Sequence, residues 1–229
     1  MSDTAPSRDQ QFIEHLLNSA PKVSAYEPSG SLLEQLIDNL LIESLGFDTK
    51  GLEAFKSSLF ESFVDWNEVR LVSADRLTPF FGQGQEAEYG RKVVQALLNK
   101  IFSRGGSLDH QFLMDFEAED LEDYLAGIME MKESTRKRLL LRVFKKNIIP
   151  ATTEHEVIFE KAGIVLAPGS EEMKELFAGL ESLDLERIQI ILDTILSEDG
   201  GGDDDGGFID PEDFNSATLN KILKKVGAA

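Results

Sequence analysis

Cysteine is absent from the 229 residues of the chain. Without thiolates the chain forms no disulfide bond, no cysteine-ligated zinc site and no cysteine-held iron–sulfur cluster, and it has no thiol nucleophile.

Positive charge is also scarce, because the chain has 23 lysines and arginines and 42 aspartates and glutamates, which gives a net charge of −19. A protein this acidic does not coat nucleic acid non-specifically. Any contact with nucleic acid needs a local basic patch that acts within a screening length of about 8–10 Å.

Long hydrophobic runs are missing as well. No apolar stretch approaches the roughly 20 residues that a membrane-spanning helix needs. The polar first ten residues, MSDTAPSRDQ, lack the apolar segment of a secretory signal. Hydrophobic residues make up 41% of the chain, which is ordinary for a globular protein. The sequence therefore predicts a globular cytoplasmic protein with no membrane partner.

Apolar residues recur at helical spacing along most of the chain, and no convincing pair of alternating strands occurs. The pattern is strongest after Ser31, where leucine and isoleucine occupy positions i, i+1, i+4, i+5, i+8 and i+9 of a segment that Gly46 ends. Such a broad apolar stripe is typical of a helix buried on much of its surface. The predicted fold class is all-α, with about a dozen short helices joined by glycine-stopped loops.

Basic residues gather in one stretch, from Glu130 to Thr153. It holds seven of the 23 in the chain, namely Lys132, Arg136, Lys137, Arg138, Arg142, Lys145 and Lys146. The pattern predicts a helix from about Ser134, its N-cap, to Asn147, shortly before Pro150. One side of this helix is apolar, and the other carries Arg138, Arg142, Lys145 and Lys146. The basic side is either a phosphate-binding face or the solvated face of an ordinary core helix.

The order of the predicted helices resembles that of a known family. Two short helices at 107–116 and 119–126, a tight turn near Gly127, and a helix that opens with polar and basic residues have the layout of a helix–hairpin–helix. Over residues 30–198 the chain resembles the endonuclease III-like (HhH-GPD) superfamily of DNA glycosylases, including the later stretch IIPATTEHEVIFEKAGIV. The resemblance implies two interleaved helical subdomains and a role in base-excision repair, in which an active member flips a damaged base into a pocket.

The chemical motifs of that family are replaced in this chain. The family's hairpin pattern, L-P-G-V-G, falls on residues 128–132, where Glu130 and Lys132 replace the two glycines that let backbone amides approach a phosphate. The family's lysine nucleophile falls on Ser134 and its aspartate on Thr152, and neither side chain can form a Schiff base or supply a carboxylate. The resemblance thus implies a scaffold without catalytic residues, metal or cofactor. It implies a DNA contact through the start of the basic helix, at Met131, Lys132, Ser134, Thr135, Arg136 and Lys137.

The sequence predicts four segments. They are an N-terminal tail with a short helix (1–29), the HhH-GPD-like domain (30–198), an acidic Gly/Asp linker (199–207) and a C-terminal short helix (208–229). Comparison of residues 199–213 with an EF-hand loop finds the first calcium ligand missing in both registers, which favours the linker. The triplet Glu154-His155-Glu156 does not form a convergent site, because consecutive helical residues point in different directions.

Two other functions remain open. Residues 151–229 hold 18 acidic and 6 basic side chains. This acidic C-terminal third could bind a protein partner, in a module that keeps the fold and has lost DNA binding. A third reading is an active glycosylase that uses relocated residues. The leading expectation is a catalytically degenerate HhH-GPD protein that binds double-stranded DNA weakly.

Overall fold

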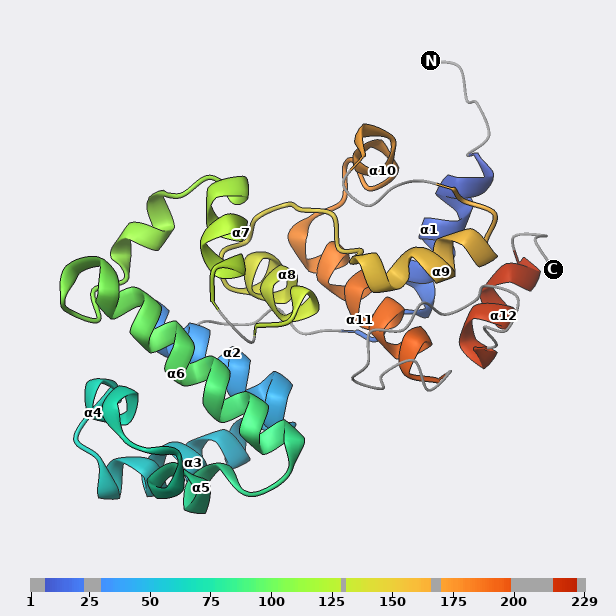
Figure 1. The fold of residues 1–229 in the computed structure, drawn as a ribbon. Helices are drawn as coiled ribbons and strands as arrows, with labels where there is room; N and C mark the ends of the chain where they lie inside the picture. The colour runs from blue at the N-terminus through green and yellow to red at the C-terminus, as the bar shows by residue number, and fades with distance from the viewer. Residues whose placement is uncertain (1–6, 23–29, 129–130, 166–169, 199–215, 226–229) are drawn as a thin grey trace. The chain divides into compact units, whose positions relative to one another are not determined.

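The computed structural model describes residues 7–22, 30–128, 131–165, 170–198 and 216–225. Within these ranges the chain forms twelve α-helices, two short 3-10 helices and no strand, which confirms the all-α prediction (Figure 1). The chain divides into two compact units: unit 1 joins Met1–Tyr26 to Lys145–Ala229, and unit 2 is Glu27–Phe144. The stretch 30–198, expected to be one domain, therefore contributes to both units.

Unit 2 is built on two long helices, α2 and α6, which pack against each other (Figure 1). The shorter helices α4 and α5 contact α6, and α3 contacts α2 and α5. Helices α7 and α8 form a pair, of which α8 also contacts α2. The bounds are α2 Leu32–Leu45, α3 Thr49–Ser62, α4 Trp66–Leu71, α5 Ala74–Phe81, α6 Gln85–Gly105, η1 Gln111–Asp115, α7 Ala118–Ala126 and α8 Glu133–Arg142.

Helix α2 begins and ends where the sequence predicts. The Ser31 hydroxyl accepts a hydrogen bond from the Glu34 backbone N–H, and the Glu34 carboxylate accepts one from the Ser31 backbone N–H. This reciprocal pair satisfies two backbone donors at the helix start. At the other end Gly46 takes a left-handed conformation with φ of 65°, which glycine adopts without steric cost. The apolar stripe between these residues is buried.

The close approach of α2 and α6 depends on a glycine. A Cβ atom added at Gly90 would lie 2.5 Å from Ser44 Oγ and 3.1 Å from Ser44 Cβ. Ser44 is buried, and its hydroxyl donates a 2.6 Å hydrogen bond to the Leu40 carbonyl one turn earlier. The side chain therefore cannot turn away without losing that bond. Gly90 sets the distance between the two central helices.

Unit 1 surrounds helix α11, which contacts α1, α9, η2 and α12. Phe159 lies at the centre of its aromatic core, 6.0 Å from the ring of Phe12 and 6.5 Å from that of Phe177, both in edge arrangements. The bounds are α1 Arg8–Ser19, η2 Thr153–His155, α9 Glu156–Lys161, α10 Glu171–Leu176, α11 Ser182–Glu198 and α12 Ala217–Lys225.

The N-terminal helix α1 is an integral part of unit 1. Its apolar residues Phe12, Ile13 and Leu16 are buried. The Arg8 guanidinium donates to the Ala162 carbonyl at 3.0 Å, and Arg187 of α11 donates to the Leu17 carbonyl at 3.1 Å. Long-range hydrogen bonds thus join the first helix of the chain to the C-terminal segment.

The C-terminal helix α12 is docked on α1 and α11. Its apolar face, formed by Leu219, Ile222 and Leu223, is buried. At its start the Glu198 carboxylate accepts hydrogen bonds from the Thr218 hydroxyl, from the Ser216 hydroxyl at 2.7 Å and from the Thr218 backbone N–H at 2.9 Å. These bonds, first among them the one from the Thr218 side chain, lower the pKa of Glu198 to about 2.

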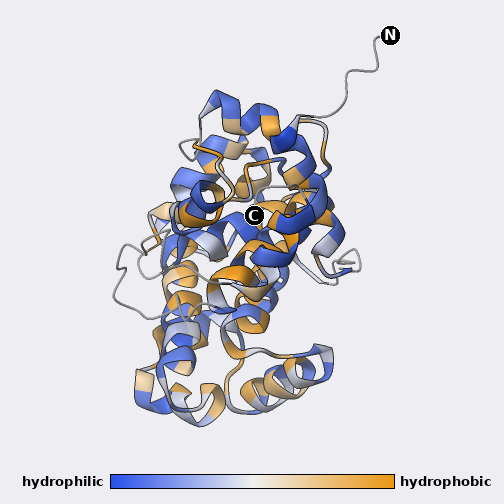
Figure 2. Ribbon diagram, turned by 90° about the vertical axis from the view of Figure 1, so that its right-hand side faces the viewer, coloured by the Kyte–Doolittle hydropathy of each residue, from blue (hydrophilic) through white to orange (hydrophobic). Residues whose placement is uncertain are grey.

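Apolar and polar residues both occur along most helices (Figure 2). Among the residues that the structure describes, no helix is both long and apolar enough to cross a membrane.

We predict that Gly90→Ala lowers the free energy of unfolding by about 1–3 kcal/mol, because the added methyl group overpacks the α2–α6 contact. Urea denaturation measures the change. The matched control is Gly105→Ala on the same helix, where a Cβ atom meets nothing within 4 Å. That control should shift stability by no more than about 1 kcal/mol. Equal losses of unfolding free energy in both variants would show that the contact with Ser44 is not the reason for a glycine at position 90.

We also predict that acid weakens the docking of α12. Because the pKa of Glu198 in the folded protein, about 2, lies below its ordinary value of 4.5, its contribution is complete above pH 4.5 and is lost as the pH falls towards 2. Glu198→Gln should therefore be less stable than the parent protein at neutral pH, with a difference that shrinks over that interval. Denaturant titrations at stepped pH measure it, with Glu181→Gln, an exposed glutamate of unit 1, as control. A difference that stays constant with pH would rule out a role for the carboxylate charge.

Candidate functional site

The basic helix α8 differs from its predicted form. It runs from Glu133 to Arg142 with Lys132 at the N-cap position, so Ser134 lies inside the helix and does not cap it. It ends five residues before Asn147, because the Phe144 N–H turns back to the Leu139 carbonyl at 3.2 Å and Lys145 adopts a left-handed φ of 53°. The boundary between the two units falls at this point, between residues 144 and 145.

The connection between α7 and α8 is a tight hairpin. The Ile128 N–H donates to the Leu125 carbonyl at 3.0 Å, and the Met131 N–H donates to the Ile128 carbonyl at 3.2 Å. The side chains of Ile128 and Met131 are buried. Residues 129 and 130 lie outside the described ranges, so the predicted effect of Glu130 stays a prediction. Lys132 has φ of −62° and ψ of 151°, a conformation that any residue adopts, so the glycine of the family pattern is not required there.

A chain of hydrogen bonds joins the start of α8 to α6 and α2. The Lys132 N–H donates to the Tyr89 hydroxyl at 3.3 Å, and the Thr135 hydroxyl donates to Glu43 Oε1 at 3.0 Å. The Tyr89 and Thr135 oxygens are 3.0 Å apart. Because the single proton of Thr135 goes to the carboxylate, Tyr89 donates to Thr135. Burial raises the pKa of the Tyr89 hydroxyl, which keeps it protonated as this arrangement requires.

The six residues predicted to contact DNA fall into two groups. The side chains of Met131, Thr135 and Lys137 are buried, with Thr135 only 1% exposed. These three are packing or hydrogen-bonding groups of unit 2. Lys132 is exposed, and Ser134 and Arg136 are partly exposed.

Two basic side chains of α8 lie close to carboxylates of the unit, and a third donates to a backbone carbonyl. Lys137 Nζ lies 3.5 Å from Glu133 Oε1, and Arg138 Nη1 lies 3.5 Å from Glu43 Oε1. Arg136 Nη1 donates to the Met131 carbonyl at 3.0 Å. Of the basic stripe predicted from the sequence, Arg138 is therefore part of a structural contact, whereas Lys145 and Lys146 lie beyond the end of α8.

Sequence reasoning missed one lysine at the hairpin. Lys100, on α6, donates from Nζ to the Gly127 carbonyl at 3.3 Å, and its Nζ lies 5.3 Å from the centre of the Tyr124 ring. The Lys132 Nζ lies at the same distance, 5.3 Å, from the Tyr89 ring. Two lysines thus flank the hairpin. No signal in the sequence could have found Lys100, because only the packing of α6 brings it to Gly127.

Thr152, onto which the resemblance places an aspartate, is part of a buried polar group in unit 1. The Thr152 N–H donates to His155 Nδ1 at 3.0 Å, and His155 Nε2 lies 2.9 Å from Asp193 Oδ1 of α11. Because a backbone N–H can only donate, Nδ1 carries the lone pair and Nε2–H donates to Asp193. Thr152 and His155 are 1% and 0% exposed. The triad fixes the start of η2 and offers no access to a substrate.

The remaining candidates do not assemble a site in the described residues. Glu154 and Glu156 are exposed while His155 is buried, so the triplet does not converge, as predicted. Ser134 belongs to unit 2 and Thr152 to unit 1. In the described ranges, no group of three or more histidine, aspartate or glutamate side chains is placed to hold a metal ion. The stretch compared with an EF-hand loop, 199–213, lies outside those ranges.

No protein-family model matches the chain, and no curated protein matches its sequence. The role of the hairpin is therefore inferred from its own contacts and charges.

We predict that His155→Ala lowers the free energy of unfolding by about 2–4 kcal/mol, because it leaves a cavity and deprives both Thr152 N–H and Asp193 of a buried partner. Denaturant unfolding followed by circular dichroism measures the loss. His15→Ala is the matched control, since His15 is a partly exposed histidine of α1 in the same unit. It should change stability by no more than about 0.5 kcal/mol. A loss as small for His155 would mean that the triad is not structural.

Proposed function

We propose that the chain binds the phosphate backbone of double-stranded DNA through the α7–α8 hairpin and does not catalyse base excision. One observation carries the proposal: α7 and α8 pack as a pair around a tight hairpin, with Lys132 exposed at the start of α8 and Lys100 bonded to the hairpin at Gly127. The divergent HhH-GPD resemblance of residues 30–198 is part of the same proposal.

A phosphate at the hairpin would meet two kinds of positive charge. The amino end of α8 contributes the partial positive charge of a helix N-terminus. Lys132 and Lys100 contribute full charges at the two sides of the turn. The hydrogen-bond chain from Lys132 to Glu43 holds the start of α8 in place. Binding of a phosphate there therefore costs little conformational entropy. Phosphate contacts of this kind position a protein without reading sequence.

The loss of catalysis is proposed from the residues themselves. Ser134 has no amine for a Schiff base, and Thr152 has no carboxylate and is buried against His155. Lys137, the nearest lysine along α8, is 7% exposed and lies beside Glu133. An amine that attacks a sugar carbon must reach it, and this one is held inside the unit.

The proposed binding is weak. The net charge of −19 repels DNA over the whole surface, and the pairing of Lys137 and Arg138 leaves few cations for phosphates. Because each phosphate contact releases counterions, affinity should fall steeply with salt.

We predict that the chain binds a duplex with an abasic site at low salt and that Lys100→Ala and Lys132→Ala each reduce the salt slope of log K by about one. Fluorescence anisotropy over a salt series measures both effects. Lys132→Arg should preserve binding because the charge remains. The matched control is Lys174→Ala, since Lys174 is an exposed lysine of unit 1 whose Nζ lies 2.7 Å from Glu171.

The same duplex separates the alternatives. No binding at low salt would refute the proposal and leave the acidic interaction module as the remaining function. Borohydride trapping tests the active-glycosylase reading, because reduction captures a Schiff base between a lysine and the sugar. We expect no covalent adduct, and an adduct would show that an amine elsewhere does the chemistry.

A further inference from the structure

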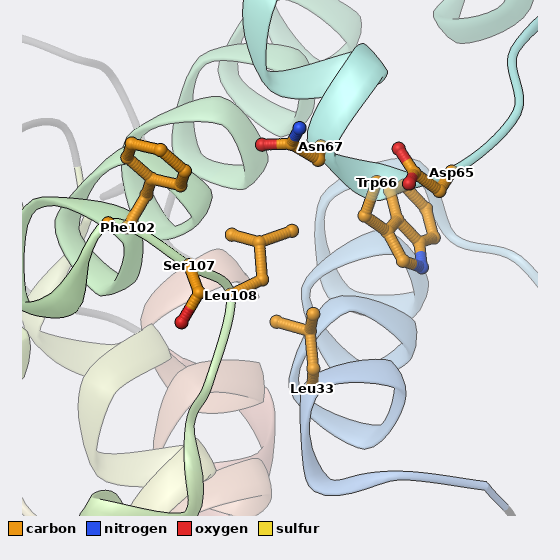
Figure 3. A pocket seen from close by; sticks show the side chains of 8 residues that line it. Leu33, Asp65, Trp66, Asn67, Phe102, Ser107 and Leu108 are labelled. Atoms are coloured by element: carbon orange, nitrogen blue, oxygen red, sulfur yellow. The ribbon is translucent and has the colours of Figure 1, made fainter.

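A cavity of about 460 Å³ opens on unit 2, away from the residues of the hairpin. Four of its lining side chains are apolar: Leu33 of α2, Trp66 of α4, Phe102 of α6 and Leu108 of the loop after α6. In the view of Figure 3, Leu33 and Leu108 lie between Trp66 on one side and Phe102 on the other. The volume and an apolar wall with few polar groups are typical of pockets that bind small molecules or single side chains.

The polar lining consists of Asp65, Asn67 and Ser107. Asp65 Oδ1 accepts a hydrogen bond from the Glu68 N–H at 2.9 Å, which leaves the second carboxylate oxygen to accept from a ligand. The Asn67 side-chain carbonyl oxygen accepts hydrogen bonds from Arg70 Nε at 3.2 Å and Nη2 at 3.1 Å. Asn67 can therefore bind a ligand as a donor, through its amide N–H groups. The cavity thus presents a charged acceptor and a neutral donor beside an apolar wall.

The segment that supplies Asp65 is acidic. Between Phe60 and Val69 the sequence has three carboxylates and no basic residue. Arg70 follows and does not line the cavity, but its guanidinium lies 3.7 Å from the centre of the Phe102 ring and donates to Asn67, so this cation packs against two of the lining side chains. The one charged side chain in the lining is Asp65.

We infer that this cavity binds an organic cation, an ammonium or guanidinium group carried on an apolar stem. Asp65 accepts the charged donor, and the apolar stem packs between Leu33, Leu108 and the rings of Trp66 and Phe102. Asn67 provides a donor for a carbonyl group on the same ligand. The chemistry fits a free aromatic amine and equally the arginine or lysine side chain of a peptide. The inference is independent of DNA binding.

Trp66 provides a direct readout, because it is the single tryptophan of the chain and lines the cavity. We would titrate the full chain with phenethylamine, with its neutral counterpart phenethyl alcohol and with the blocked dipeptide N-acetyl-Phe-Arg-amide, and follow tryptophan fluorescence. Calorimetry of the same titrations detects binding that leaves fluorescence unchanged. The stronger of the two cationic ligands identifies the natural source as a small amine or a peptide.

The test variant is Asp65→Asn, since asparagine caps a helix as well as aspartate does but carries no charge. The matched control is Asp48→Asn, at another capping aspartate that accepts a backbone N–H, from Gly51 at 2.7 Å, and does not line the cavity. We expect saturable binding of a cationic ligand, weakened about three- to tenfold by Asp65→Asn and unchanged by Asp48→Asn. Equal binding of the amine and the alcohol, no effect of Asp65→Asn, or no saturable binding of any ligand would each overturn the inference.

Discussion

The hydrogen-bond chain from the Lys132 N–H through Tyr89 and Thr135 to Glu43 is the constraint on which the hairpin depends. Removing polar groups from water costs free energy unless each finds a partner. Here one donor and one carboxylate terminate a chain whose two hydroxyls each donate once and accept once. It joins three helices, α8, α6 and α2. A shift of α8 along α2 would break every link together, so these hydrogen bonds fix the start of α8 relative to α6 and α2.

The same network explains why a basic helix gives little basic surface. Glu43 receives both the Thr135 hydroxyl and the Arg138 guanidinium, and Glu133 lies beside Lys137 one turn along α8. A cation held beside a carboxylate has its charge largely balanced, so it contributes little to neutralising a phosphate. The lysines at the hairpin itself are Lys132, whose side chain is exposed, and Lys100, which donates to the Gly127 carbonyl. One of them, Lys100, comes from another helix.

Local signals allowed much of the fold to be predicted. Helix α2 follows Ser31 and ends at Gly46 as predicted, because such boundaries depend on only a few neighbouring residues. The predictions failed where tertiary contacts decide. Helix α8 stops at Arg142, where the chain passes from one unit to the other. No signal in the sequence indicates the bond between His155 and Asp193 of α11, because the two residues are 38 positions apart.

Helix α6 links the two candidate sites. Tyr89 and Lys100 on this helix hold the hairpin, and Phe102, two residues after Lys100, lines the cavity beside α4. Both sites belong to unit 2, so neither depends on a residue of unit 1. This differs from the arrangement that the family resemblance implies, in which a base enters a pocket between two subdomains. If Ser134 and Thr152 stand where an active member has its lysine and aspartate, such a pocket is not needed, and both candidate sites can be built on α6.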